Sequence, residues 1–356
     1  MTFLTNNSWR GSLFLGLVIG LGLLALLFSQ LSLKQAWQTL TRLDGRQLLV
    51  PLLVTMACLP LRPWRWQTIF PPETRPKFWA CFSVLYVGNM SNNFLPGRGG
   101  DLLRCFLVRR EASLAGATLV LATLGLEKVL DGLALLVVVL FSFWLFSPSQ
   151  WLGQLGLFSG FIFTGALAVL VLLRYRAIWF LTLTRFVFRK IHLEPLGKKV
   201  NTLFERFAEG LGILSSLQQV VRAIGLTVMV WVGEAALIWR LASALQIPLS
   251  LPEAAVVSAV LGLGLMIPAA PGSIGTYEFF SITAFRLFGI DSESALALTL
   301  VMHAWSFMAT TLLGLVGLWM SGMNFSQLIK GAPNSRCWGD RVMGGWGEKT
   351  GADFII

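Results

Sequence analysis

The sequence predicts an all-α polytopic membrane protein, with about six full transmembrane helices and two re-entrant or broken helical hairpins arranged as inverted repeats. Its 356 residues are 55% hydrophobic and only 13% charged, and its mean hydropathy of +0.72 exceeds that of soluble domains. Several apolar stretches are long enough to cross a bilayer. Two others are interrupted by Pro-Gly-x-x-Gly, at 96–100 and at 271–275. Such residues at membrane depth predict a broken backbone, which is tolerated only where protein or water covers it.

The first half of the chain is expected to form two helices, a broken hairpin and a third helix. We interpret the first apolar stretch as a retained span rather than a signal peptide, because no small-x-small cleavage site follows it. The second span ends in Arg62-Pro63-Trp64-Arg65-Trp66, a pattern typical of an anchor at the membrane interface. The predicted elements are the helices 11–30 and 47–62, the half-helices 78–94 and 101–110, and the helix 116–146.

The second half repeats this order with an insertion. Residues 174–222 mix basic residues with Trp and Phe, which predicts amphipathic helices lying on an anionic lipid surface. The glycine-rich tail, 323–356, lacks helical periodicity and is expected to be disordered. The other predicted elements are the helices 156–173 and 223–245, the half-helices 253–267 and 274–288, and the helix 292–320.

The distribution of Lys and Arg predicts the orientation in the membrane. With the N-terminus inside, most basic residues between the spans fall on the cytoplasmic side, so we expect both termini to be cytoplasmic. Three full helices then separate the two hairpins, which must enter from opposite sides. We therefore predict one transmembrane domain, 1–322, built of inverted repeats at about 11–146 and 156–320, an arrangement typical of transporters.

Several function classes are disfavoured by the sequence. The net charge of +11 lacks the basic stripe of a nucleic-acid-binding fold, so no nucleic-acid partner is expected. The four cysteines lie far apart, which indicates neither a disulfide framework nor a zinc ribbon. No phosphate-binding loop or metal-spaced cluster is found, so we expect no cofactor, no metal and no ATP hydrolysis.

The first break carries the strongest candidate site. Backbone N–H groups at the start of a half-helix, together with an arginine, favour an anion such as phosphate. Arg98 instead pairs with Asp101 or Glu127 in the alternative interpretation. Arg104 is expected at the membrane interface. The two asparagines cap the broken helix or contact a headgroup. The candidate binding residues here are Asn92, Asn93, Gly97, Arg98, Asp101 and Arg104.

Further candidates lie on the helices around the breaks. Glu127 and Asp131 share one helix face, while Lys128 is expected to point elsewhere, so the two acids indicate a cation or proton site or partners for an arginine. A direct pair between Glu234 and Arg240 is not expected, because the two are six residues apart.

The second break supplies the remaining candidates, Gly272, Glu278 and His303. Glu278 follows the glycines closely, and either caps the second half-helix or binds the ammonium group of a substrate. His303 serves in packing or in a proton relay.

Three stretches of the sequence resemble signatures of one family, the flippase-like transmembrane domain of lysylphosphatidylglycerol synthases, which also occurs alone in integral membrane proteins. They are Asn92-Asn93-Phe94-Leu95-Pro96-Gly97-Arg98-Gly99-Gly100-Asp101-Leu102-Leu103-Arg104, Glu127-Lys128-Val129-Leu130-Asp131-Gly132 and Pro271-Gly272-Ser273-Ile274-Gly275-Thr276-Tyr277-Glu278. The resemblance covers about residues 10–322. It implies movement of aminoacylated, other polar or isoprenoid lipids between leaflets. The aminoacyl-transferase domain of the full-length synthases has no counterpart here, so lipid synthesis is not expected.

Together these features predict a lipid translocase and not an enzyme. It would move a polar-headgroup phospholipid or an isoprenoid-linked lipid between the leaflets of a bacterial cytoplasmic (inner) membrane. The alternatives are a membrane-embedded transferase acting on a lipid phosphate, and an accessory subunit or scaffold for a neighbouring enzyme. The sequence is also compatible with a homo-oligomer.

Overall fold

The computed structural model describes residues 33–41, 43, 45–95, 98–111, 116–146, 150–190, 194–267 and 270–322. Within these ranges the chain is helical and contains no strand, which confirms the all-α polytopic fold class. Five stretches of these residues are long and apolar enough to cross a membrane. The predicted first span, 11–30, the tail, 323–356, and Gly97 lie outside the described residues.

The first hairpin is formed by α5 (Phe78–Phe94) and α6 (Gly99–Glu111), close to the predicted half-helices. Before it come α2 (Leu33–Leu40), the short 3-10 turn η1 (Gly45–Leu48), α3 (Leu49–Cys58), α4 (Leu61–Ile69) and η2 (Pro72–Thr74). The predicted end of the second span at residue 62 is therefore wrong, since α4 continues to Ile69. Pro60 and Pro63 lie at the N-cap and in the first turn of α4, where no intrahelical N–H donor is needed.

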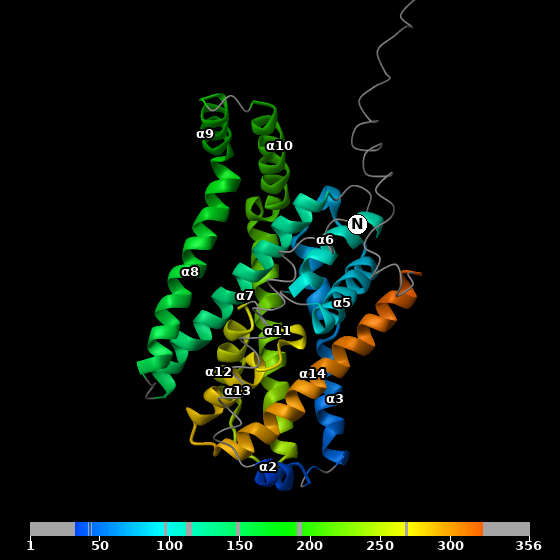
Figure 1. The fold of residues 1–356 in the computed structure, drawn as a ribbon, viewed down its shortest axis with the longest axis vertical. Helices are drawn as coiled ribbons and strands as arrows, with labels where there is room; N and C mark the ends of the chain where they lie inside the picture. Colours follow the sequence, from blue (N-terminus) through cyan, green and yellow to red (C-terminus); the bar gives the residue numbers. More distant parts are fainter. Residues whose placement is uncertain are drawn as a thin grey trace, which may run out of the picture.

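The second hairpin is formed by α12 (Leu251–Gly264), the turn η5 (Pro271–Ser273) and α13 (Thr276–Arg286). Long helices flank both hairpins: α7 (Ala117–Leu145), α8 (Gln150–Tyr175), α11 (Leu217–Ala244) and α14 (Ser292–Met320). Ser250 and Glu253 form a reciprocal capping box that fixes the start of α12. Figure 1 shows α5 and α6 in the upper half of the bundle and α12 and α13 in the lower half.

The two breaks meet inside the bundle. We call the chain between α5 and α6 the first break, and the chain between α12 and α13 the second break. Nη1 of Arg98 in the first break donates a hydrogen bond of 2.8 Å to the carbonyl of Leu265, where α12 ends. A Cβ built on Gly272 would lie 3.5 Å from the carbonyl oxygen of Asn93. The ends of the two hairpins are therefore in direct contact, as broken helices are in transporters.

Close contact between α5 and α14 holds the first hairpin in place. A Cβ on Gly317 would lie 2.9 Å from the carbonyl oxygen of Ser83, and a Cβ on Gly314 would lie 2.3 Å from Cβ of Met90. Ser83 Oγ donates a hydrogen bond of 2.7 Å to the carbonyl of Gly317. Small residues at this helix interface let the two backbones approach, as is common in membranes.

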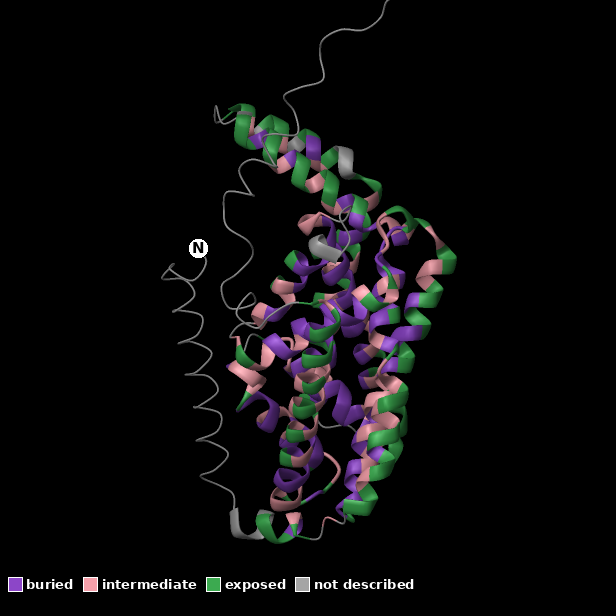
Figure 2. Ribbon diagram, turned by 90° about the vertical axis from the view of Figure 1, so that its right-hand side faces the viewer, coloured by how far each residue is buried: buried purple, intermediate pink, exposed green. Residues whose placement is uncertain are grey.

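The outer surface of the bundle is apolar. Trp144, Phe161 and Trp319 lie on three different long helices, and each is at least 80% exposed. The outward faces of the long helices are green in Figure 2. Because water would disfavour such a surface, these side chains are suited to contact lipid tails.

The predicted surface segment forms α9 (Ala177–Lys190) and α10 (Glu194–Gly210), followed by η4 (Gly212–Ser215). These two helices pair with each other through the stacked rings of Phe180 and Phe204. They project beyond the bundle at the end where α5 and α6 lie (Figures 1 and 2). Their exposed surface mixes apolar and basic side chains, including Trp179, Phe186, Leu203, Arg185 and Arg189.

Candidate site at the meeting of the two breaks

A central cavity of about 300 Å³ lies beside the contact between the two breaks. Its apolar lining comes from α3, α11, α12 and α14, and it contains aromatic side chains such as Trp231, Tyr277 and Trp305. Five charged residues also line it: Arg62, Arg98, Lys128, Asp131 and Glu234. The cavity is therefore apolar in most of its wall and charged in one region, which suits a polar group attached to an apolar molecule.

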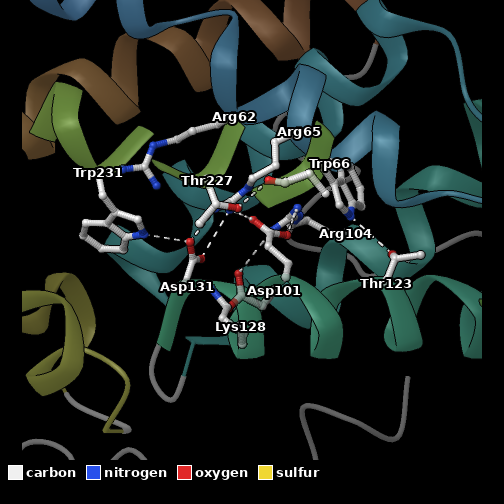
Figure 3. Close-up of polar contacts among 12 residues, drawn as sticks. Arg62, Arg65, Trp66, Asp101, Arg104, Thr123, Lys128, Asp131, Thr227 and Trp231 are labelled. Carbon is white, nitrogen blue, oxygen red and sulfur yellow. Dashed lines mark hydrogen bonds and ion pairs between the residues drawn. The ribbon is translucent and has the colours of Figure 1, made fainter. Parts of the chain in front are cut away.

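A cluster of buried ion pairs supports one wall of this cavity (Figure 3). Arg65 on α4 is fully buried and forms an ion pair with Asp131, and its Nη2 lies 2.8 Å from Glu127 Oε1. Arg104 on α6 donates to the other oxygen of Glu127 at 2.9 Å. The guanidinium of Arg104 also lies 4.1 Å from the ring centroid of Trp66. Three helices, α4, α6 and α7, are thus joined by ion pairs between buried side chains.

Two of these residues correct the sequence analysis. Arg104 was expected at the membrane interface, but it is only 2% exposed. Arg65 was assigned with its neighbours to an interface anchor, but its exposure is 0%, as is that of Trp66. Both arginines point into the bundle because the two acids on α7 need cationic partners there, and a buried charge without a partner is strongly destabilising.

Asp101 joins this cluster to the cavity. Its Oδ2 lies 3.2 Å from Nε of Arg98 and 3.7 Å from Nζ of Lys128, and its Oδ1 lies 3.8 Å from Nη1 of Arg104. Arg98 therefore pairs with Asp101, as the alternative interpretation of the sequence proposed. Lys128, which was expected to point elsewhere, instead reaches Asp101 and the cavity.

Positive charge exceeds negative charge where the cluster meets the cavity. Arg98 and Lys128 share a single carboxylate oxygen, and their side chains are 35% and 33% exposed. Among the described residues of the cluster, four cations face three acids: Arg65, Arg98, Arg104 and Lys128 against Asp101, Glu127 and Asp131. The side of the cluster that faces the cavity is therefore suited to an anion.

A second ion pair also lines the cavity. Arg62 on α4 pairs with Glu234 on α11. Trp231, one turn before Glu234, donates from its indole nitrogen to Asp131 Oδ1 at 3.0 Å. Glu234 thus has Arg62 as its partner, while the guanidinium of Arg240 lies 4.0 Å from the ring centroid of Trp239.

The two asparagines hold the first break rather than point freely into the cavity. Oδ1 of Asn92 accepts a hydrogen bond of 2.8 Å from the backbone N–H of Gly100, so Asn92 satisfies an unpaired donor at the start of α6. Nδ2 of Asn93 donates to Thr310 and Thr311 on α14, each at 3.0 Å. Asn92 therefore caps the start of α6, as one of the two interpretations of the sequence proposed, whereas Asn93 joins α5 to α14.

The second break is held by His303 and Glu278. Glu278 Oε2 accepts a hydrogen bond of 2.6 Å from the backbone N–H of Gly275, so Glu278 caps α13. Its other oxygen lies 2.6 Å from Nδ1 of His303, whose Nε2 lies 2.8 Å from the carbonyl oxygen of Gly272. Tyr277 stacks on the imidazole with 4.3 Å between ring centroids. A small cavity of about 100 Å³ adjoins this group and shares Leu265 and Tyr277 with the central cavity.

Among the polar residues that line the site, the sequence analysis did not assign Arg62, Lys128, Trp231 and Glu234 to it. The sequence did contain a signal for the arginines that follow Pro60. Glu127 and Asp131 were recognised as intramembrane acids, and such acids require cationic partners. Arg62 and Arg65, at the end of an apolar helix, were instead assigned to an interface anchor.

The described residues offer no group of three or more His, Cys, Asp or Glu side chains that could hold a metal ion. Cys58, Cys81 and Cys105 are free thiols. The polar groups gathered at the breaks include amides, guanidiniums, carboxylates, the ammonium of Lys128 and the imidazole of His303. They are suited to bind ions and hydrogen-bonding groups.

Comparison with known proteins places the chain in a family. The family model described as lysylphosphatidylglycerol synthase TM region matches residues 13–314. A UPF0104 membrane protein of Methanocaldococcus jannaschii is 23% identical over 250 residues, covering 68% of this chain and 74% of that protein. A UPF0104 membrane protein of Methanothermobacter thermautotrophicus is 25% identical over 265 residues, covering 70% and 77%. No solved structure gives a significant match. This chain belongs to the lysylphosphatidylglycerol synthase TM region family.

Proposed function

We propose that this protein is a lipid translocase, which moves a phospholipid or isoprenoid-linked lipid with an anionic headgroup between membrane leaflets without chemically changing it. The observation that carries the proposal is the central cavity, where Arg98 and Lys128 expose a positive surface inside an otherwise apolar bundle. The family match supports a role in the membrane that involves lipids.

The physical basis is the energy of moving a charged group through hydrocarbon. A phosphate loses its hydration in the bilayer core, which makes unaided crossing very slow. The guanidinium of Arg98 and the ammonium of Lys128 replace part of that hydration with charge-assisted hydrogen bonds. Acyl chains remain in the bilayer, against the apolar outer surface of the helices.

The helices α9 and α10 support a second part of the proposal, contact with an anionic membrane surface. Exposed arginines and lysines attract acidic headgroups, and exposed aromatic side chains such as Trp179 and Phe186 insert among them. This contact would set the position of the bundle in a bacterial cytoplasmic membrane, with both termini on the cytoplasmic side, as the sequence predicts.

Leaflet exchange of fluorescent phospholipids in reconstituted vesicles tests the proposal. We expect wild-type protein to accelerate exchange, and more so in vesicles that contain anionic lipid. Arg98→Ala should slow the protein-dependent rate by about tenfold, because a hydrogen bond to a charged group contributes roughly 1.5–3 kcal/mol.

Arg240→Ala is the matched control. Arg240 lies over the ring of Trp239 and is not among the residues that line the cavity. Its variant should exchange lipid at the wild-type rate. Equal rates for the wild type and Arg98→Ala would refute the site, and no acceleration by the wild type with any tested lipid would refute the function.

A further inference from the structure

The side chains of His303 and Glu278 form a hydrogen-bonded pair inside the membrane, away from the ion cluster. His303 lies on α14, and Glu278 lies in the first turn of α13. The backbone carbonyl of Gly272 has no proton to give, so Nε2 of His303 must carry the hydrogen of that contact. The 2.6 Å contact between Nδ1 and Glu278 Oε1 then requires one further proton between these two atoms.

This second proton determines whether the pair is stable. With the proton present, the pair is an imidazolium beside a carboxylate, or a neutral imidazole beside a carboxylic acid. In both forms the two side chains attract each other. Without it, the lone pair of Nδ1 faces a negative carboxylate at 2.6 Å, and the contact becomes repulsive. Because the same carboxylate also accepts from the N–H of Gly275, its displacement would release the start of α13.

The backbone that the pair holds is strained. Ser273 has a φ of 58°, in the left-handed region that side chains with a Cβ rarely adopt. Gly272 and Gly275 have φ values of 65° and 86°. Glycine adopts such values readily, but at Ser273 the conformation persists only where the surroundings enforce it, and His303 bonds directly to the carbonyl of the preceding Gly272. Loss of the pair would therefore leave the second break free to change conformation.

When the proton leaves, the other described groups that face the pair do not supply a positive charge in its place. Tyr277 on α13 stacks on the imidazole, and Asn92 and Asn93 of α5 line the same small cavity as neutral amides. Arg98 from the first break and Glu234 from α11 line the adjoining central cavity. Arg98 is engaged with Asp101 and the carbonyl of Leu265, while Glu234 is engaged with Arg62.

We propose that His303 and Glu278 form a proton-binding site that holds the second break closed when it is occupied and lets it open when the proton leaves. Since Gly272 contacts Asn93 and Leu265 accepts from Arg98, opening of the second break also separates it from the first break. Release of a proton is thereby coupled to access to the central cavity beside their contact. Only the coupling of proton release to lipid movement rests on the proposed translocase function.

Amide hydrogen exchange of the protein in lipid nanodiscs tests the proton site directly. After correction for intrinsic exchange rates, we expect exchange in 270–276 of the wild type to rise by at least about tenfold from about pH 5 to about pH 9, the range that brackets histidine titration. His303→Gln and Glu278→Gln should remove this pH dependence. Exchange in α12, 251–264, serves as the internal control. A wild type without pH dependence, or a His303→Gln variant that keeps it, would overturn the proposal.

Transport in the same vesicles tests the coupling. If one proton moves with each lipid, an imposed gradient of one pH unit should change the equilibrium ratio of labelled lipid between leaflets by about tenfold. His303→Gln should abolish this shift. An unchanged ratio in wild-type vesicles that do exchange lipid would refute the coupling alone. Vesicles that exchange no lipid would refute the proposed function, while hydrogen exchange would still decide whether the proton site exists.

Discussion

At the scale of single residues, buried charge determines the structure around the cavity. Arg65 lies between Glu127 and Asp131, and Arg104 holds the remaining oxygen of Glu127. Each of these side chains has lost its hydration, so each depends on its partners for stability. The cluster fixes the relative positions of α4, α6 and α7, and with them the wall that carries Arg98 and Lys128.

Arg65→Ala should therefore destabilise the protein severely. The substitution leaves two carboxylates buried with fewer cationic partners, and breaking such a pair costs about 3–5 kcal/mol. We expect the thermal unfolding midpoint of the purified protein in detergent to fall by roughly 10 °C. Arg206→Ala, at an exposed position on α10, should leave the midpoint within about 1 °C of the wild type. Equal midpoints for both variants would contradict the structural role of the cluster.

The individual partners in this cluster were only partly predictable from the sequence. Glu127 and Asp131 were recognised as one face of a helix because four-residue spacing is local information. Their partner, Arg65, lies more than sixty positions earlier in the chain. Arg65 follows an apolar helix next to Trp64 and Trp66, which is also the pattern of an interface anchor. The local sequence pattern does not distinguish a buried ion-pair partner from an interface anchor, because the difference depends on whether α4 enters the bundle.

At the scale of elements, each break depends on close packing at particular glycines. A Cβ on Gly100 would lie 2.0 Å from the carbonyl oxygen of Gly88 and 2.7 Å from Oδ1 of Asn92. A Cβ on Gly88 would lie 2.5 Å from Cγ of Arg104, so the same glycine also leaves room for that arginine. The first hairpin is therefore closed by two glycines that face each other across α5 and α6.

Gly100→Ala and Gly125→Ala should change stability in opposite directions. At Gly100 the new methyl group meets backbone atoms, so α5 and α6 must separate and the unfolding midpoint should fall. At Gly125, inside α7, no atom beyond the adjoining residues and backbone of the helix itself lies within 4 Å of the added Cβ. Alanine there should stabilise the helix by about 0.5–1 kcal/mol. Thermal unfolding measures both, and a stable Gly100→Ala variant would show that the hairpin packs differently.

Element positions were predicted more completely than element ends. The predicted half-helices at 78–94 and 101–110 became α5 (Phe78–Phe94) and α6 (Gly99–Glu111), since glycine and proline mark a break locally. The end of the second span was misplaced because Arg62-Pro63-Trp64-Arg65-Trp66 was interpreted as an interface anchor, whereas these residues lie within α4. The contact between Arg98 and Leu265 joins residues far apart in the sequence, and no local pattern indicates it.

At the scale of the whole molecule, apolar side chains cover the outside of the long helices and a cluster of charged side chains lies inside the bundle. Phe161 and Trp319 are more than 80% exposed, whereas Arg65 and Arg104 are nearly inaccessible. This distribution lets the bundle dissolve in lipid while it maintains, beside the contact of its two hairpins, a cavity with one charged region. The orientation of the termini and the boundaries of the inverted repeats stay predictions.

Photochemical labelling tests most directly whether the central cavity binds a lipid headgroup. Vesicles would contain the wild-type protein and a phospholipid that carries a small photoreactive group beside its phosphate, and labelled peptides would be identified by mass spectrometry. We expect labels on cavity-lining residues of α7, α11 and α12, and about tenfold less labelling there in Arg98→Ala. Labels confined to outward-facing positions such as Phe161 and Trp319, with no effect of Arg98→Ala, would contradict the account.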